Sequence, residues 1–113
     1  MNNRQVTRID GGCKKVFTRH DKKAARRLFE DGETISLMTA DRNPANSLTT
    51  EIDYTKGESL FWNAHNTACT FDDVLEDFAE WQENDGYGHM PDHRAAREQR
   101  FSFWTWFAVP DWE

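Results

Sequence analysis

The sequence predicts an α+β domain with an antiparallel or mixed sheet of four to five strands and two amphipathic helices packed on one of its faces. Two segments repeat apolar residues at helical spacing, and both carry capping residues at their ends. Short strand-like segments lie around them, and one of these, FSFWTWFAV at residues 101–109, is apolar on both faces. The apolar sides of the helices need a surface to cover, and a sheet provides it.

Length and composition indicate one folded domain, residues 1–113. Aromatic residues make up 13% of the chain, whereas disordered chains contain few of them. No apolar run approaches the roughly 18 residues that cross a membrane, and the N-terminus lacks the apolar core of a signal peptide. We therefore expect a cytoplasmic protein without membrane association, in which Cys13 and Cys69 are free thiols.

The N-terminal part is predicted to form a hairpin followed by a helix. VTRID and CKKVF, residues 6–10 and 13–17, are strand-like and are separated by a glycine-rich turn. The helix KKAARRLFED, residues 22–31, follows Asp21 as its N-cap and precedes Gly32, where a glycine commonly ends a helix. Its apolar arc consists of Ala24, Ala25, Leu28 and Phe29.

The middle of the chain is predicted to contain two strands with a loop between them. ETISLMTA, residues 33–40, and LTTEIDY, residues 48–54, have strand-like composition. The intervening DRNPANS contains the breakers that are typical of a loop. LFW, residues 60–62, is apolar but too short to assign to a helix or a strand.

The second helix is predicted to begin after Thr70 and to end at Asp85 and Gly86. Thr70 and Asp73 have the spacing of a capping box, with Asp in place of Glu. The apolar arc of this helix consists of Phe71, Val74, Leu75, Phe78 and Trp81. A short third helix is expected to start near Asp92.

The closing strand alternates between two apolar faces. The residues of the two faces are Phe101, Phe103 and Phe107 on one and Trp104 and Trp106 on the other. We expect this strand at the centre of the sheet, with its Phe face beneath the helices. The Trp face needs another cover, which either the loop from Tyr54 to Trp62 or a second copy of the chain would provide. Trp104 and Trp106 are therefore candidate interface residues, since Trp is enriched at protein interfaces.

Charge is unevenly distributed along the chain, whose net charge is −6. Residues 1–27 hold nine Lys or Arg and two Asp, whereas residues 28–113 hold five Lys or Arg and eighteen Asp or Glu. The acidic face of the second helix is either solvated or paired with the basic first helix, or it imitates a phosphate backbone and occupies the basic groove of a nucleic-acid-binding protein. The last interpretation assigns partner binding to Asp72, Asp73, Glu76, Asp77, Glu80 and Glu83.

The first helix supports an alternative function. A basic cluster near its start could contact phosphate directly, and its members are His20, Lys22, Lys23, Arg26 and Arg27. The cluster could equally pair with the acidic helix of the same chain. Because the chain as a whole is acidic, direct nucleic-acid binding through Lys22, Lys23, Arg26 and Arg27 is the less favoured function.

Metal-binding and catalytic patterns are weak. His65 and Cys69, and then His89 and His93, have a spacing that resembles a zinc site, but it is not that of a standard zinc finger. The sequence contains no nucleophile elbow and no glycine-rich phosphate loop. We therefore predict no metal, no cofactor, no catalytic residues and no enzymatic activity.

Three segments, GETISLMTADRNPAN, TFDDVLEDFAEWQ and FSFWTWF, resemble a group of short uncharacterised proteins carried by phages, plasmids and conjugative elements of bacteria. The resemblance spans residues 24–107 and implies an origin in a mobile element. Small acidic proteins of such elements often resemble inhibitors of host defence nucleases, including anti-CRISPR and antirestriction proteins. The sequence thus predicts a non-enzymatic inhibitor that binds a host protein or nucleoprotein complex through its acidic helix.

Overall fold

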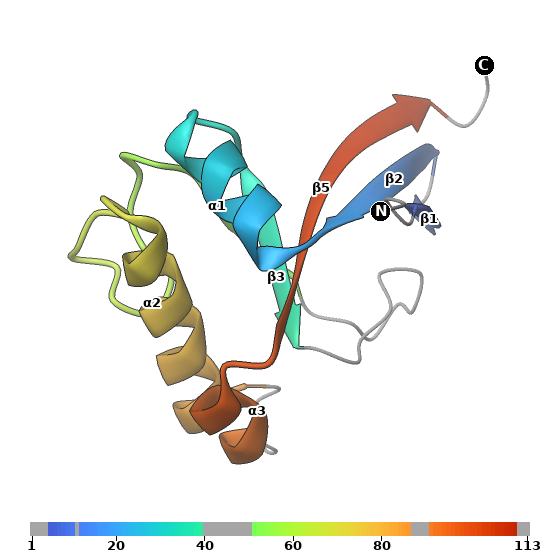
Figure 1. Ribbon diagram of the computed structural model, residues 1–113. Helices are drawn as coiled ribbons and strands as arrows, with labels where there is room; N and C mark the ends of the chain where they lie inside the picture. The colour runs from blue at the N-terminus through green and yellow to red at the C-terminus, as the bar shows by residue number, and fades with distance from the viewer. Residues whose placement is uncertain (1–4, 11, 40–50, 87–90, 111–113) are drawn as a thin grey trace.

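The computed structural model describes residues 5–10, 12–39, 51–86 and 91–110. Its strands are β1 (Gln5–Asp10), β2 (Cys13–His20), β3 (Ile35–Thr39), β4 (Ile52–Tyr54) and β5 (Phe101–Pro110). Its helices are α1 (Lys22–Glu30), α2 (Phe71–Asn84) and α3 (His93–Glu98). Figure 1 shows the helices gathered on one side of the sheet, which confirms the predicted α+β class.

The strands form one five-stranded antiparallel sheet in the order β1-β2-β5-β3-β4. The closing strand β5 lies at the centre, as its two apolar faces predict. Trp104 of β5 pairs with Arg19 of β2 on one side and with Ser36 of β3 on the other. The element that comes last along the described chain therefore joins the two halves of the sheet.

Local capping explains where the helices begin and end. Asp21 accepts a hydrogen bond from the Ala24 N–H at 2.7 Å, and Gly32 follows the helix with a φ of 93°, a conformation that favours glycine. Thr70 and Asp73 form the predicted capping box. All three helices begin directly after the residues that the sequence predicts near their starts, and Asp92 is the N-cap of α3.

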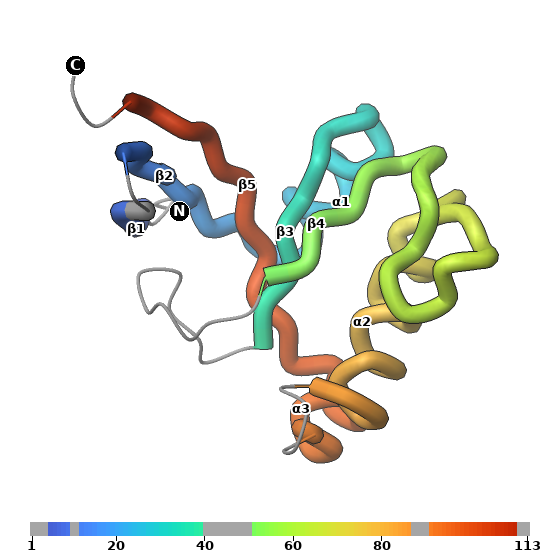
Figure 2. Tube along the Cα trace, turned by 180° about the vertical axis from the view of Figure 1, so that it is seen from behind, coloured from blue at the N-terminus to red at the C-terminus, as the bar shows by residue number. Residues whose placement is uncertain are grey.

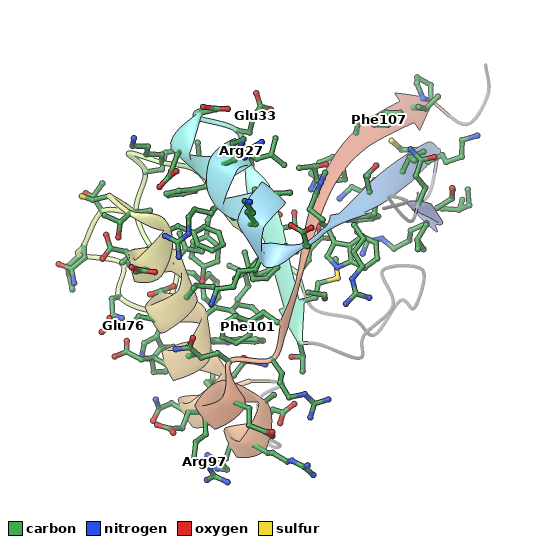
Figure 3. The ribbon with its side chains drawn as sticks, viewed as in Figure 1. Arg27, Glu33, Glu76, Arg97, Phe101 and Phe107 are labelled. Carbon is green, nitrogen blue, oxygen red and sulfur yellow. The ribbon has the colours of Figure 1, made fainter. Side chains whose placement is uncertain are left out.

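The main core lies between the helices and the Phe face of β5. The Phe71 ring of α2 is 5.6 Å from the Phe103 ring, and the Phe78 ring is 5.0 Å from the Phe101 ring. These contacts confirm that the Phe face packs beneath the helices at this end of the strand. Phe107 differs, because the far end of β5 extends with β1 and β2 beyond the helices and leaves this side chain 54% exposed (Figures 1 and 3).

The opposite face of the sheet has its own apolar cluster. Trp104 is 1% exposed and packs with Phe17 of β2 and Met38 of β3, and Trp106 lies at the edge of this cluster. The loop that follows Tyr54 lies beside α2 and away from β2 and β5 (Figure 2), so the prediction that it covers the Trp face is wrong. Residues of the chain's own strands bury Trp104 instead.

Several predicted element bounds change in the structure. The strand expected over residues 33–40 is Ile35–Thr39, and all five of its residues are buried. The strand expected over 48–54 is Ile52–Tyr54, and residues 48–50 lie outside the described part of the chain. Residues 60–62 belong to a loop that an isolated bridge between Ser59 and Thr67 closes.

None of the helices among the described residues is both long and apolar enough to cross a membrane. Cys13 in β2 and Cys69 in the loop before α2 are free thiols.

Candidate partner-binding surface

The carboxylates of α2 occupy three different environments. Asp72, Glu76 and Glu83 are exposed, and in Figure 3 Glu76 projects from α2 away from the sheet. Asp73 and Glu80 are half-buried, and Asp77 is 1% exposed. The sequence predicts a single acidic face that contains all six residues. Because Asp77 is buried, its assignment to a partner-binding surface is corrected.

Asp77 is buried because its carboxylate holds the loop that precedes α2. The hydrogen bonds that it accepts come from the Tyr54 hydroxyl at 2.8 Å, the Phe61 and Trp62 N–H groups at 3.0 Å, the Asn63 N–H at 2.7 Å and the Asn63 side-chain amide at 3.3 Å. A buried carboxylate is tolerated only with partners of this kind. Burial raises the pKa of Tyr54 far above its usual value, and the hydrogen bond to Asp77 adds a smaller contribution in the same direction.

Asp73 also serves the local structure of the chain. Its carboxylate accepts hydrogen bonds from the Thr70 N–H at 2.9 Å and the Cys69 N–H at 3.1 Å, which completes the capping box at the start of α2. A negative charge at this end of a helix is also favoured by the helix dipole. Asp73 is thus occupied with the cap, although its side chain is still partly accessible to solvent.

An open groove of about 340 Å³ lies along α2, where α1 and α3 approach it. Its acidic residues are Asp72, Glu76, Glu80 and Glu83, its small apolar residues are Leu75, Ala79 and Ala96, and Lys22 and Gln99 complete the lining. Among the described residues, neither Glu76 nor Glu83 forms an ion pair. The groove therefore offers uncompensated negative charge beside a small apolar surface.

The basic helix α1 meets the acidic helix α2 at one end of this groove. Arg26 lies 3.2 Å from Asp72, and its guanidinium also stacks over the Phe71 ring at 4.9 Å. Lys22, Lys23 and Arg27 are all exposed, and Lys22 also lines the groove. Exposed ion pairs contribute little to stability, and among the described residues this contact leaves Glu76 and Glu83 of α2 without an ion pair.

The two candidate Trp residues of β5 differ in accessibility. Trp104 is buried, so its assignment to a partner surface is corrected: its ring contributes to the second apolar cluster. Trp106 is partly exposed, with the Lys15 ammonium 4.2 Å from its ring centre. Trp106 alone of this pair could contact another molecule without rearrangement of the sheet.

The residues with metal-like spacing do not form a described cluster. His65 and Cys69 are exposed in the loop before α2, and His93 is exposed at the start of α3. His89 lies outside the described residues. Within the described ranges, no group of three or more His, Cys, Asp or Glu side chains has an arrangement that could hold a metal ion.

Sequence reasoning missed the structural role of Asp77. A residue that lies three positions after Val74 and four before Trp81 shares their side of a helix, so Asp77 sits at the border of the apolar arc. A carboxylate at that border is a sign of a buried acceptor. Its donors, in residues 54 and 61–63, cannot be identified from the helix itself.

Comparison of the chain with known protein families, with curated proteins and with solved structures gives no match.

Proposed function

We propose that the chain is a non-enzymatic protein-binding module that uses the acidic surface of α2 to block the nucleic-acid-binding site of a partner. The partner is a host protein or nucleoprotein complex, and the inhibitor is of the anti-CRISPR or antirestriction type from a mobile element. The resemblance of residues 24–107 to phage and plasmid proteins supports the origin. The charge of the α2 surface supports the mode of binding.

One observation carries the proposal: four carboxylates of α2 line a single groove, and among the described residues only Asp72 of these four forms an ion pair, with Arg26 of α1. The acidic residues of the groove run from Asp72 to Glu83, and Lys22 is its one cationic residue among the described residues. Like charges four residues apart, such as Glu76 and Glu80, destabilise a helix by roughly 0.2–0.5 kcal/mol. Helix stability alone does not favour this arrangement, whereas binding to a cationic surface does.

The spacing of these charges suits an imitation of nucleic acid. The helical rise of about 1.5 Å per residue places the ends of the acidic row roughly 16 Å apart. A DNA strand carries one phosphate about every 3.4 Å along its axis. Four carboxylates over that length lie about 5.5 Å apart on average, more widely than the phosphates of one strand, and they can replace some of those phosphates at a basic groove and release the counterions bound there.

The test is protection of a phage from host defence. The chain is expressed in a bacterial host that carries a restriction or CRISPR system, and the efficiency of plaquing of a sensitive phage is measured. Wild type should raise plaquing, and the charge reversal Glu76→Lys with Glu83→Lys should abolish the effect. Glu80 is left unchanged because the Asn63 side-chain amide donates a hydrogen bond to its carboxylate.

The matched control reverses two exposed carboxylates elsewhere, Glu30→Lys with Glu33→Lys. This variant changes the net charge by the same amount but leaves the α2 groove intact, so it should protect the phage as wild type does. Equal loss of protection in both variants would show that net charge, rather than the α2 surface, is responsible. Absence of protection by wild type against every system tested would refute the inhibitor function.

A further inference from the structure

The loop between β4 and α2 displays two large apolar side chains. We call residues 55–69 the aromatic loop. Phe61 is 53% exposed and Trp62 is 41% exposed, although both lie in a loop with many internal hydrogen bonds. Exposed neighbouring aromatic residues are unfavourable in water unless a partner covers them, and such patches commonly mark interaction sites.

The backbone that carries these two residues is fixed from both sides. Asp77 accepts hydrogen bonds from three successive N–H groups, those of Phe61, Trp62 and Asn63. Within the loop, Leu60 N–H donates to the Asn66 carbonyl at 2.9 Å, and the Ala68 N–H donates to the Glu58 carbonyl at 2.8 Å. A loop held in this way loses little entropy on binding, so its aromatic residues are prepared for a partner.

The exposed pair lies next to the acidic surface of α2. The Phe61 ring packs edge-on against the Trp81 ring of α2, with 6.2 Å between centroids. Asn63, the next residue but one, donates a hydrogen bond to Glu80, which also lines the acidic groove. Aromatic faces and carboxylates thus adjoin on one side of the molecule, and both groups attract cationic side chains.

We propose that Phe61 and Trp62 form the apolar part of the partner-binding surface, and that the partner segment which docks there is amphipathic and rich in Lys and Arg. Phe61 and Trp62 pack against the apolar side chains of the segment and against the aliphatic stems or guanidinium groups of its Lys and Arg residues. Glu76, Glu80 and Glu83 form ion pairs with its ammonium and guanidinium groups. This inference rests on the proposed function, and it names the chemistry of the partner at that site.

Charge complementarity selects this occupant. Helix α2 contains no Lys or Arg, and the aromatic loop contains only Lys56. A nucleic acid could stack on Trp62, but its phosphates would be repelled by the carboxylates of α2. A second copy of the chain would bring the same acidic surface to itself about a two-fold axis, which is unfavourable for the same reason.

The experiment compares two labelled peptides of equal length and charge. One is an amphipathic helix of Lys and Leu, and the other has the same Lys residues with Ser in place of every Leu; binding to the chain is followed by fluorescence anisotropy at about 0.15 M salt. The amphipathic peptide should bind at least about tenfold more tightly than the Lys and Ser peptide. Trp62→Ala and Phe61→Ala should each reduce that preference, and the indole N–H signal of Trp62, assigned with Trp62→Phe, should shift in an NMR titration with the amphipathic peptide.

The control is Phe107→Ala, which removes an equally exposed aromatic ring from β5, far from α2, and should leave peptide binding unchanged (Figure 3). Unchanged affinity in Trp62→Ala and Phe61→Ala, together with weaker binding in Glu76→Lys with Glu83→Lys, would overturn the role of the loop and leave the acidic surface standing. Failure of both peptides to bind would also overturn the inference, while the plaquing test decides the inhibitor function separately.

Discussion

The Tyr54 hydroxyl donates a hydrogen bond to Asp77 Oδ2 at 2.8 Å, and through this contact the edge strand β4 is joined to helix α2. Tyr54 is 1% exposed, as is Asp77, so neither group has access to water as an alternative partner. The same carboxylate holds the backbone of residues 61–63. One buried side chain therefore fixes the sheet edge, the helix and the aromatic loop relative to one another.

Replacing Tyr54 by Phe is expected to lower the free energy of unfolding by about 1.5–3 kcal/mol, because a buried hydrogen bond to a charged acceptor is lost. Urea unfolding followed by circular dichroism measures the change. The ring and its packing are retained, so the effect reports the hydroxyl alone. A Tyr54→Phe variant as stable as wild type would mean that the N–H groups of residues 61–63 alone meet the hydrogen-bonding needs of the Asp77 carboxylate.

Replacing Asp77 by Asn is expected to release the aromatic loop. The amide has one acceptor oxygen, and its NH₂ group would face N–H donors, so at least one of these backbone groups would lose its partner at about 1–3 kcal/mol. Hydrogen exchange of the Phe61, Trp62 and Asn63 amides should accelerate relative to those of the central strand β5. Asp72→Asn, at an exposed position of the same helix, is the control and should leave exchange in the loop unchanged.

Two Phe residues on the same face of β5 should differ sharply in their contribution to stability. Phe103 is 6% exposed and contacts Phe71, so Phe103→Ala should cost about 3–5 kcal/mol through lost burial and a cavity. Phe107→Ala, at a position that is 54% exposed, should change stability by less than about 0.5 kcal/mol. Chemical denaturation of both variants measures the difference in the free energy of unfolding. Similar losses of stability in the two variants would contradict the structure, in which the helices cover Phe103 but not Phe107.

Folding stability should depend on pH through His20. Burial lowers the pKa of His20 below its usual value of 6.5, with the nearby Asp21 charge acting in the opposite direction. Just below pH 6.5 the unfolded chain therefore binds more protons than the folded chain. The stability contributed by neutral His20 is fully present above pH 6.5 and is lost as the pH falls below that value.

Urea midpoints of wild type and His20→Gln, measured between about pH 5 and pH 8, test this dependence. The Gln side chain can retain the hydrogen bond to the Thr105 hydroxyl, which His20 makes at 2.8 Å. The stability of wild type relative to the variant should fall below pH 6.5. A difference that stays constant across the range would exclude His20 as the group responsible.

The fold was largely predictable because its signals are local. Asp21, Thr70 and Asp92 each stand directly before a helix and cap it in the structure. The apolar faces of β5 indicate a central strand without knowledge of its neighbours. Where the sequence has no regular period, as at residues 60–62, it predicts neither structure nor role, because long-range contacts with α2 decide the conformation there.

The candidate surface was predicted only in part. Glu76 and Glu83 are exposed, as a charged helix face implies. Asp77 is not, because its burial depends on donors that lie 14–23 residues away along the chain. The exposure of Phe61 and Trp62 cannot be predicted from the sequence, because composition does not distinguish an exposed aromatic pair from a buried one.

The position of β5 has a consequence for how the chain acquires its structure. β2 and β3 have no hydrogen-bonded contact with each other in the sheet and are joined only through β5, which follows both by more than sixty residues. During synthesis the two halves of the sheet cannot combine until that strand leaves the ribosome, and such late, distant pairings slow folding. The apolar residues of β2 and β3 must therefore be kept from aggregating, either in the free nascent chain or bound to a chaperone, until β5 has been synthesised.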